Sequence, residues 1–223
     1  MKDVNYRFWN EYYPVVKSKF VGVLPDEVKD FHKAETDKMI SLVKKGQRYL
    51  FIGCGDGREF EPIIDMDIQI VGVDYVKSVI DECNDKFKNR KNVSAIVSSA
   101  QNISFEDASF NGVFILYNNL SVLGERIPIL KEIKRVLKKG GFLFGTVYNE
   151  YAKDVQVESY KGLDMDYLRH DDETVTVISK NGITYTSGRW AEKRLKKLFS
   201  SVDWSVNVKP LTSISWEYVA YND

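Results

Sequence analysis

Three alternate glycines follow a short apolar run near residue 50. In "YLFIGCGDGREF" (residues 49–60), Gly53, Gly55 and Gly57 stand directly after residues typical of a buried strand. A glycine has no side chain to keep the backbone away from a ligand, so this loop suits close approach of a bound molecule. The G-x-G-x-G spacing differs from the G-x-G-x-x-G of pyrophosphate-binding folds, and no G-K-[ST] follows. A plain chain reversal before a helix is the alternative interpretation.

An acidic residue ends the next apolar run. The segment "IQIVGVDYV" contains Asp74, which follows Gly57 by 17 positions (57 to 74). A carboxylate at the end of a second strand can accept hydrogen bonds from both hydroxyls of a ribose. Asp74 could instead cap the following helix. The glycine loop and the acid together, at this distance, favour a ligand that contains a ribose.

These residues must be positioned by strands, and five candidate strands are short, apolar and often β-branched. They are residues 48–52, 68–73, 93–97, 112–116 and 142–147. Runs of this kind are typical of strands covered on both faces. Helical segments lie before and between them, and this alternation predicts a parallel sheet with crossover helices.

Two segments show clear helical periodicity. Residues 25–46 begin with Pro25 and two acids, and an apolar face follows, made of Val28, Phe31, Met39, Leu42 and Val43. Residues 125–141, "ERIPILKEIKRVLKKGG", have a basic, glycine-terminated end that is typical of a helix C-terminus. Their apolar stripe consists of Ile127, Leu130, Ile133 and Leu137.

The C-terminal part departs from this alternation. "TVTVISKNGITYTS" (residues 174–187) is two alternating runs around Asn181 and Gly182, which is a strong hairpin signal. A short helix follows, and then "VDWSVNV" and "SISWEYV" alternate with period two on either side of Pro210. We expect these last two strands to pair antiparallel at one edge of the sheet.

Composition excludes several classes of protein. The 223 residues carry 32 basic and 32 acidic side chains, so no net charge indicates nucleic acid or an acidic membrane as a partner. No apolar run approaches the roughly 20 residues of a membrane span, and "MKDVNYRFWNEYY" lacks the apolar centre of a secretory signal. Cys54 and Cys83 form no disulfide framework or metal-binding spacing. We therefore predict a cytoplasmic protein without a metal site; the sequence indicates no oligomeric state.

Four motifs in order resemble those of class I S-adenosylmethionine-dependent methyltransferases. "GCGDGR" matches the first motif of that family and "VGVDYV" the second. "VSSAQNISFEDASFNGVFILYNNLSVL" follows the pattern of the adenine contact and fourth strand, and "LKEIKRVLKKGGFLFGTVYN" that of the next helix, glycine turn and fifth strand. The resemblance covers roughly residues 45–147 and implies an α/β, doubly wound, seven-stranded sheet of Rossmann-like type. Its last strand is expected to be antiparallel, with an N-terminal helical lid and an inserted β-hairpin.

The same resemblance divides a single methyltransferase domain, residues 1–223, into four parts. Residues 1–46 are predicted to form the helical lid segment and residues 47–147 the cofactor-binding core. Residues 148–188 are predicted to be an inserted segment that covers the substrate, and residues 189–223 the final helix and strands.

The resemblance also implies which residues contact the cofactor, S-adenosyl-L-methionine. The loop backbone would approach its methionine part, Asp74 its ribose and Tyr75 one face of its adenine. The full predicted set is Gly53, Cys54, Gly55, Asp74, Tyr75, Ser99, Ala100, Gln101 and Tyr117.

Two residues depart from the pattern of that family. Its members commonly carry an acid two residues before the first glycine, where this chain has Phe51. They often carry aspartate at the position of Ser99, where it accepts a hydrogen bond from the adenine amine. Serine can still accept such a bond, without the charge, and Asp56 inside the loop is a possible replacement for the first acid.

Acceptor-binding residues are expected in the segments outside the core. The predicted set is Trp9, Tyr13, Asn118, Tyr148 and Arg169. The N-terminal aromatic residues could form a lid or simply attach a helix to the core. His170, Tyr148 and Asn118 are the candidates for a catalytic role, since a histidine can act as a general base. A solvated surface position is the alternative for His170, and His32 is expected to be structural.

The predicted function is methyl transfer from S-adenosylmethionine to a nitrogen or oxygen of a small-molecule acceptor. Neither an Asn-Pro-Pro-Tyr-type turn nor a cysteine nucleophile follows the fourth strand, where the turn reads "YNNLS". The balanced charge also opposes a nucleic-acid substrate, and no membrane partner is expected. The alternatives are a non-catalytic or degenerate S-adenosylmethionine-binding protein, or a methyltransferase that acts on RNA or protein.

Overall fold

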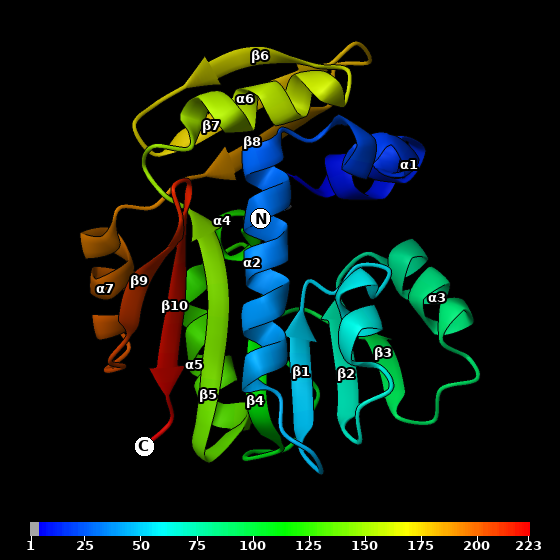
Figure 1. Ribbon diagram of the computed structural model, residues 1–223, viewed down its shortest axis with the longest axis vertical. Helices are drawn as coiled ribbons and strands as arrows, with labels where there is room; N and C mark the ends of the chain where they lie inside the picture. The colour runs from blue at the N-terminus through cyan, green and yellow to red at the C-terminus, as the bar shows by residue number, and fades with distance from the viewer. Residues whose placement is uncertain (1–4) are drawn as a thin grey trace.

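The computed structural model describes residues 5–223, apart from the side chains of residues 18–21, and shows a seven-stranded sheet with the order β3-β2-β1-β4-β5-β10-β9 (Figure 1). Its strands are β1 (Arg48–Ile52), β2 (Gln69–Asp74), β3 (Val93–Val97), β4 (Phe110–Ile115), β5 (Leu137–Tyr148), β9 (Asn207–Thr212) and β10 (Ser215–Tyr221). The first five strands run parallel, and β10 runs antiparallel to both β5 and β9. The predicted fold class, including its antiparallel strand at the end of the chain, is confirmed.

The parallel strands place their carboxyl ends at one edge of the sheet. In Figure 1 the arrow of β1 points toward the top of the view, where the glycine loop leaves it. Strand β1 lies at the centre, hydrogen-bonded to β2 on one side and β4 on the other. The order of the strands therefore reverses beside the glycine loop, which is where open α/β sheets bind their ligands.

One predicted boundary is wrong. Helix α5 (Arg126–Val136) ends before the glycines, and β5 begins at Leu137 rather than at residue 142. The extra residues are accommodated by a register shift in the β4–β5 pairing and by the left-handed backbone of Gly140 (φ +72°). Of the predicted apolar stripe, Leu130, Ile133 and Leu137 are buried, whereas Ile127 is 43% exposed; Ile129 and Val136 complete the buried face.

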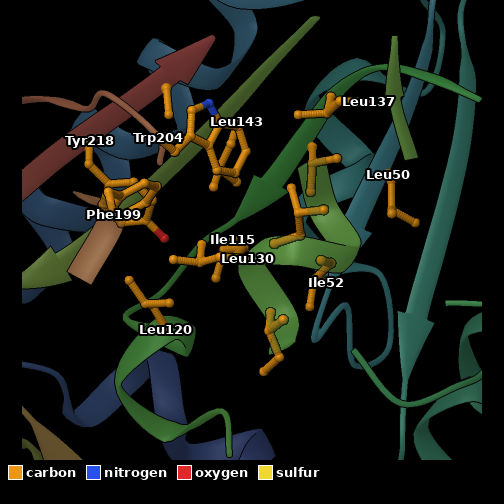
Figure 2. Close-up of a cluster of buried hydrophobic side chains, with 14 of the residues drawn as sticks. Leu50, Ile52, Ile115, Leu120, Leu130, Leu137, Leu143, Phe199, Trp204 and Tyr218 are labelled. Carbon is orange, nitrogen blue, oxygen red and sulfur yellow. The ribbon is translucent and has the colours of Figure 1, made fainter. Parts of the chain in front are cut away.

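Helices cover both faces of the sheet, as a doubly wound fold requires. Helices α5 and α7 (Glu192–Ser200) lie on one face, and α2 (Asp26–Leu42), the 3₁₀ helix η2 (Arg58–Ile63) and α3 (Lys77–Lys86) lie on the other. Figure 2 shows the first face, with Leu130 of α5 among the side chains of the sheet. Phe199 of α7 packs against Tyr218 of β10, with ring centroids 5.5 Å apart. Burial of this kind contributes about 1.5–3 kcal/mol for each large apolar side chain.

A second, three-stranded sheet covers the carboxyl edge of the first (Figure 1). It consists of β6 (Met165–His170), β7 (Thr174–Ser179) and β8 (Thr184–Gly188), and helix α6 (Lys153–Gly162) packs on it. We call these four elements the roof. The predicted hairpin is confirmed as β7 and β8, with Gly182 at φ +74° in its turn, whereas β6 was not predicted.

The N-terminal helices lie beside the roof. They are the π-helix η1 (Phe8–Tyr12) and α1 (Tyr13–Val23). Phe8 packs on Tyr185 of the roof with ring centroids 4.1 Å apart, and the Tyr12 hydroxyl donates to the carbonyl of Leu163 over 2.6 Å. These contacts attach the N-terminal helices to the roof. Within residues 5–223, no helix combines the length and the apolar character that crossing a membrane requires.

Candidate active site

The glycine loop has a left-handed backbone at each of its three glycines. Gly53, Gly55 and Gly57 have φ values of +70°, +52° and +74°. A Cβ atom on Gly53 would lie 2.8 Å from the side-chain amide nitrogen of Asn119, and one on Gly57 would lie 2.7 Å from the Phe60 ring. A Cβ atom on Gly55 would meet nothing within 4 Å. Packing therefore excludes side chains at Gly53 and Gly57, whereas Gly55 faces open space.

Asp74 holds this loop in place. Its carboxylate accepts hydrogen bonds from the backbone N–H of Gly55 (3.1 Å) and of Val76 (2.9 Å), so it joins the loop to the start of α3. Burial raises the pKa of Asp74, although these backbone hydrogen bonds act to lower it. Each carboxylate oxygen keeps a second lone pair, so Asp74 can also accept from a ligand.

A cavity opens between the carboxyl edge of the sheet, the N-terminal helices and the roof. Its walls come from the glycine loop, the ends of β2 and β4, and aromatic residues of the covering elements. Its lining residues include Trp9, Tyr13, Lys17, His32, Gly53, Cys54, Gly55, Asp56, Arg58, Glu59, Asp74, Tyr75, Glu82, Ala100, Tyr117, Asn118, Tyr148, Ser159, Tyr160, Tyr185 and Ser187.

The structure brings most of the predicted cofactor residues together in this cavity. Seven of the nine line it, and the other two, Ser99 and Gln101, line an adjoining hollow that also contacts Tyr75 and Ala100. The Ser99 hydroxyl accepts the backbone N–H of Gln101 over 3.2 Å. The two hollows thus meet where the adenine contact was predicted.

Two predicted residues lie elsewhere. Arg169 and His170 are exposed on β6 and do not line the cavity. The His170 ring contacts Lys153 Nζ, 2.9 Å from its Nε2, and the Tyr167 hydroxyl. The roof turns this strand outward, so the structure gives no support to an acceptor contact at Arg169 or to a base at His170.

Asn118 lines the cavity, but its amide is fully occupied. The amide nitrogen donates to Ser187 Oγ (3.0 Å) and to the Gly188 carbonyl (3.2 Å), and the amide oxygen accepts from Ser121 and from the Tyr148 N–H. Since an amide has two donors and two acceptor sites, none remains for an acceptor molecule. Asn118 therefore connects the core to the roof, and its hydrogen bonds support a structural role.

Tyr148, the third catalytic candidate, is a buried phenol at the cavity wall. Burial raises the pKa of Tyr148 well above its usual value of 10. Its hydroxyl therefore keeps its proton near neutral pH, so it can donate a hydrogen bond but does not act as a general base.

Glu35, on α2, is a buried acid that sequence reasoning missed. It is fully buried, and one of its oxygens accepts the backbone N–H of Tyr117 (2.8 Å) and the Thr146 hydroxyl. Tyr117 and Asn118 are consecutive non-glycine residues with positive φ (+53° and +60°). A strained turn of this kind persists only where its surroundings hold it, and Glu35 supplies that support. Burial raises the pKa of Glu35 to about 7, partly offset by these hydrogen bonds.

Three further cavity residues were also missed. Arg58 stacks its guanidinium 4.2 Å from the Tyr117 ring centroid, and Glu59 is 7% exposed. His32, expected to be structural, lines the cavity beside Tyr117. Burial, with the Arg58 charge as the second cause, lowers the pKa of His32 to about 3, so the ring is neutral.

Comparison with known proteins identifies the core of this site. Residues 50–145 match the family model described as a methyltransferase domain. Residues 50–145 therefore carry a methyltransferase domain, and the chain has the fold of a solved SAM-dependent methyltransferase. The predicted resemblance is confirmed.

Individual relatives agree with this family. A demethylmenaquinone methyltransferase of Staphylococcus saprophyticus is 27% identical over 122 residues, which are 53% of this chain and 52% of that protein. The chain thus spans about half the length of the curated relatives it matches. A crystal structure of a Pyrococcus horikoshii protein has a TM-score of 0.72 and 21% identity, covering 96% of this chain and 99% of that one. A Methanosarcina mazei protein described as a SAM-dependent methyltransferase has a TM-score of 0.65 and 18% identity, covering 82% and 96%. At these identities, the structural likeness shows the fold.

The methyltransferase domain has the features that its cofactor, S-adenosylmethionine, requires. Gly55 leaves space at the loop, Asp74 has free lone pairs for a ribose, and Tyr75 offers an aromatic ring for the base. The methionine end of the cofactor carries an ammonium and a carboxylate group, and the cavity offers charged side chains of both signs beside the loop. The residues present therefore fit the cofactor.

Replacing Asp74 with asparagine should weaken binding of S-adenosylmethionine by at least about tenfold, because hydrogen bonds to a charged group contribute about 1.5–3 kcal/mol each. The fold should also lose some stability, since the carboxylate anchors Gly55 and Val76. Isothermal titration calorimetry measures the affinity, and Asp81→Asn, an exposed change on α3, is the control. An unchanged affinity in folded Asp74→Asn would show that Asp74 does not bind the ribose.

Proposed function

We propose that the protein transfers a methyl group from S-adenosylmethionine to a nitrogen or oxygen of a small-molecule acceptor. The observation that carries this proposal is the covered cavity, in which the cofactor residues of the methyltransferase domain meet a wall of aromatic residues. The name of the Staphylococcus relative supports a small acceptor, because demethylmenaquinone is a small molecule.

The cover over the cavity favours a small acceptor over RNA or protein. The Asn5 side chain donates to the Thr186 carbonyl (2.8 Å) and accepts the Thr186 N–H (2.9 Å), so the N-terminal segment is joined to β8. Lys17 of α1 forms an ion pair with Glu82 of α3. These bonds attach the N-terminal helices on two sides of the site. We propose that residues 1–46 act as a lid and that residues 148–188 cover the acceptor, within a single domain of residues 1–223.

The acceptor wall is aromatic and carries hydroxyl groups. Trp9, Tyr13, Tyr148, Tyr160 and Tyr185 line it. Burial raises the pKa of Tyr160 to about 12 and that of Tyr185 well above 10, so these phenols are neutral. Neutral phenols can donate hydrogen bonds to oxygen or nitrogen atoms, and the rings can stack on a planar molecule. This wall suits a planar acceptor with polar substituents.

For methyl transfer, the main task of the chain is to position the acceptor relative to the methyl group of the cofactor. When bound, the cofactor would supply an activated methyl group on a sulfonium, and the chain would have to hold the acceptor atom in line with it. Orientation of the reacting groups can lower a barrier by about 7–11 kcal/mol, and the aromatic wall and roof exclude water. His32 is the neutral imidazole at the cavity wall and can accept a hydrogen bond from the acceptor. A cytoplasmic location and the absence of a nucleic-acid partner stay predictions.

The test has two stages. Titration calorimetry should show binding of S-adenosylmethionine and of S-adenosylhomocysteine to the protein. Release of S-adenosylhomocysteine should then be measured with phenols, quinols and planar amines, with bulk RNA and a protein extract as competing substrates. Turnover with a small molecule is expected. Cofactor binding without turnover on any substrate supports the degenerate alternative, and turnover on RNA or protein alone refutes the small-molecule assignment.

A further inference from the structure

Among the described residues, four carboxylates line the cavity, and two of them have evident partners. They are Asp56, Glu59, Asp74 and Glu82. Asp74 accepts two backbone hydrogen bonds, and Glu82 is paired with Lys17. Asp56 lies in the loop and is half-exposed, so water can solvate it. Glu59 is the remaining carboxylate of the four, and it is buried.

Glu59 lies in the first turn of η2, directly after the glycine loop. It is 7% exposed, and no ion pair of its carboxylate is found within the described part of the chain; its one hydrogen bond is to its own backbone amide. Burying an acid that forms no ion pair is costly, and the nearby Arg58 charge only partly offsets the burial, so such a residue at a cavity wall indicates a ligand that supplies a cation. Burial raises the pKa of Glu59 to about 8.

The position usually acidic in this family carries no charge here. Phe51 is 1% exposed and lies among Phe60 and Phe114 rather than at the cavity. The Gly53 carbonyl accepts the Asn119 side-chain amide over 3.0 Å, and as a neutral group it can offer a cation only its second lone pair. In this segment the acids at the cavity wall are Asp56, in the loop, and Glu59, in the turn after it, and of these two only Glu59 is buried.

We propose that Glu59 binds the ammonium group at the methionine end of S-adenosylmethionine. The assignment rests on the proposed function, since it needs the cofactor in this cavity. Arg58, the preceding residue, lies at the same wall with its guanidinium 4.2 Å from the Tyr117 ring centroid, and it places a positive charge beside Glu59. Adjacent side chains of opposite charge thus match the adjacent opposite charges of an amino acid.

Binding of the ammonium group should then release one proton from Glu59. In the free protein Glu59 is protonated near neutral pH; the ligand ammonium favours the carboxylate, and the released proton goes to the buffer. Groups that face Glu59 also act on it: Asp56 and Arg58 in the same segment, Cys54 in the loop, Cys83 of α3, Tyr13 of α1 and Tyr117 after β4. Affinity for the ammonium should therefore rise between about pH 6 and about pH 8 as Glu59 ionises more readily.

The experiment uses three ligands that differ at one end. S-adenosylhomocysteine has the ammonium and the carboxylate, its decarboxylated analogue has only the ammonium, and 5′-methylthioadenosine has neither. Glu59→Gln should bind the first two at least about tenfold more weakly than the wild type, and should bind 5′-methylthioadenosine within about twofold. Glu61→Gln, an exposed change on the same turn where Glu61 pairs with Lys86, should bind all three normally.

Proton release gives a second, independent readout. Calorimetry of S-adenosylhomocysteine binding in buffers of different ionisation enthalpy should show release approaching one proton for the wild type near pH 7. The release should fall to near zero for Glu59→Gln and persist for Glu61→Gln. A purely structural role for Glu59 would not produce this difference.

The outcomes separate this assignment from the proposed function. If the wild type binds none of the three ligands, the proposed function fails and the assignment fails with it. If the wild type binds S-adenosylhomocysteine and Glu59→Gln binds it equally well, with the same proton release, the Glu59 assignment alone is wrong. Equal weakening toward all three ligands would likewise overturn it, because the loss would then not depend on the ammonium.

Discussion

Replacing Gly55 with valine is expected to abolish binding of S-adenosylmethionine. A Cβ atom at this position enters the open space beside the loop, where the ligand must approach the backbone. The two methyl groups of valine would extend further into that space. Gly55 also has φ +52°, so a β-branched residue there would strain the loop that Asp74 holds. Titration calorimetry should detect no binding at millimolar ligand.

The control for this variant is Gly46→Val. Gly46 has φ +75°, a Cβ atom on it would meet nothing within 4 Å, and it lies in the exposed turn before β1. Both variants should lose about 1–2 kcal/mol from the left-handed backbone, but only Gly55→Val should lose the ligand. If folded Gly55→Val binds S-adenosylmethionine as the wild type does, the loop is only a turn.

Replacing Phe51 with aspartate is expected to cause the largest loss of stability. Phe51 stacks on Phe114 with ring centroids 4.9 Å apart and meets Phe60 edge-on at 5.0 Å. The variant would lose about 1.5–3 kcal/mol of burial, about 0.5–1.5 kcal/mol for each aromatic pair, and the cost of a buried carboxylate in addition. That sum is a large fraction of the roughly 5–15 kcal/mol by which most domains are stable.

Melting temperatures with and without S-adenosylmethionine test this directly. The wild type should be stabilised by the ligand through linkage, whereas Phe51→Asp should melt far lower and recover little. Phe51→Leu, which keeps an apolar side chain, should lose much less stability and respond to the ligand as the wild type does. A ligand that stabilises Phe51→Asp more than the wild type would show that position 51 reaches the cofactor after all. A ligand that stabilises neither protein would favour the degenerate alternative.

Sequence motifs identified the missing acid at Phe51 but not the buried acid at Glu59. The resemblance located the loop, Asp74 and the missing acid, since these depend on positions along a strand and its turn. It did not locate Glu59, because an acid in the sequence "REFEPI" resembles any exposed charge of a first turn. Only the packing of η2 against α3 and the sheet shows that this acid is buried while its neighbour Glu61 is exposed.

Glu35 is different, because a signal for it was present in the sequence. It stands in phase with Val28, Phe31 and Met39 on the buried face of α2, where an apolar residue is expected. A charged residue at a core position of a helix indicates either a buried partner or a function. The partner itself, the Tyr117 backbone, lies 82 residues away and could be found only in the folded chain.

The sequence alone located the core strands, the cofactor loop and the hairpin around Gly182. These follow from local rules: apolar period, β-branched runs, and glycines where φ must be positive. The tertiary structure decided which way the roof faces. Strand β6 exposes Arg169 and His170 to the solvent. All hydrogen-bonding sites of the Asn118 side-chain amide are used in contacts that join the roof to the core. Such outcomes depend on hydrogen bonds and packing between residues far apart in the chain, and no local pattern encodes them.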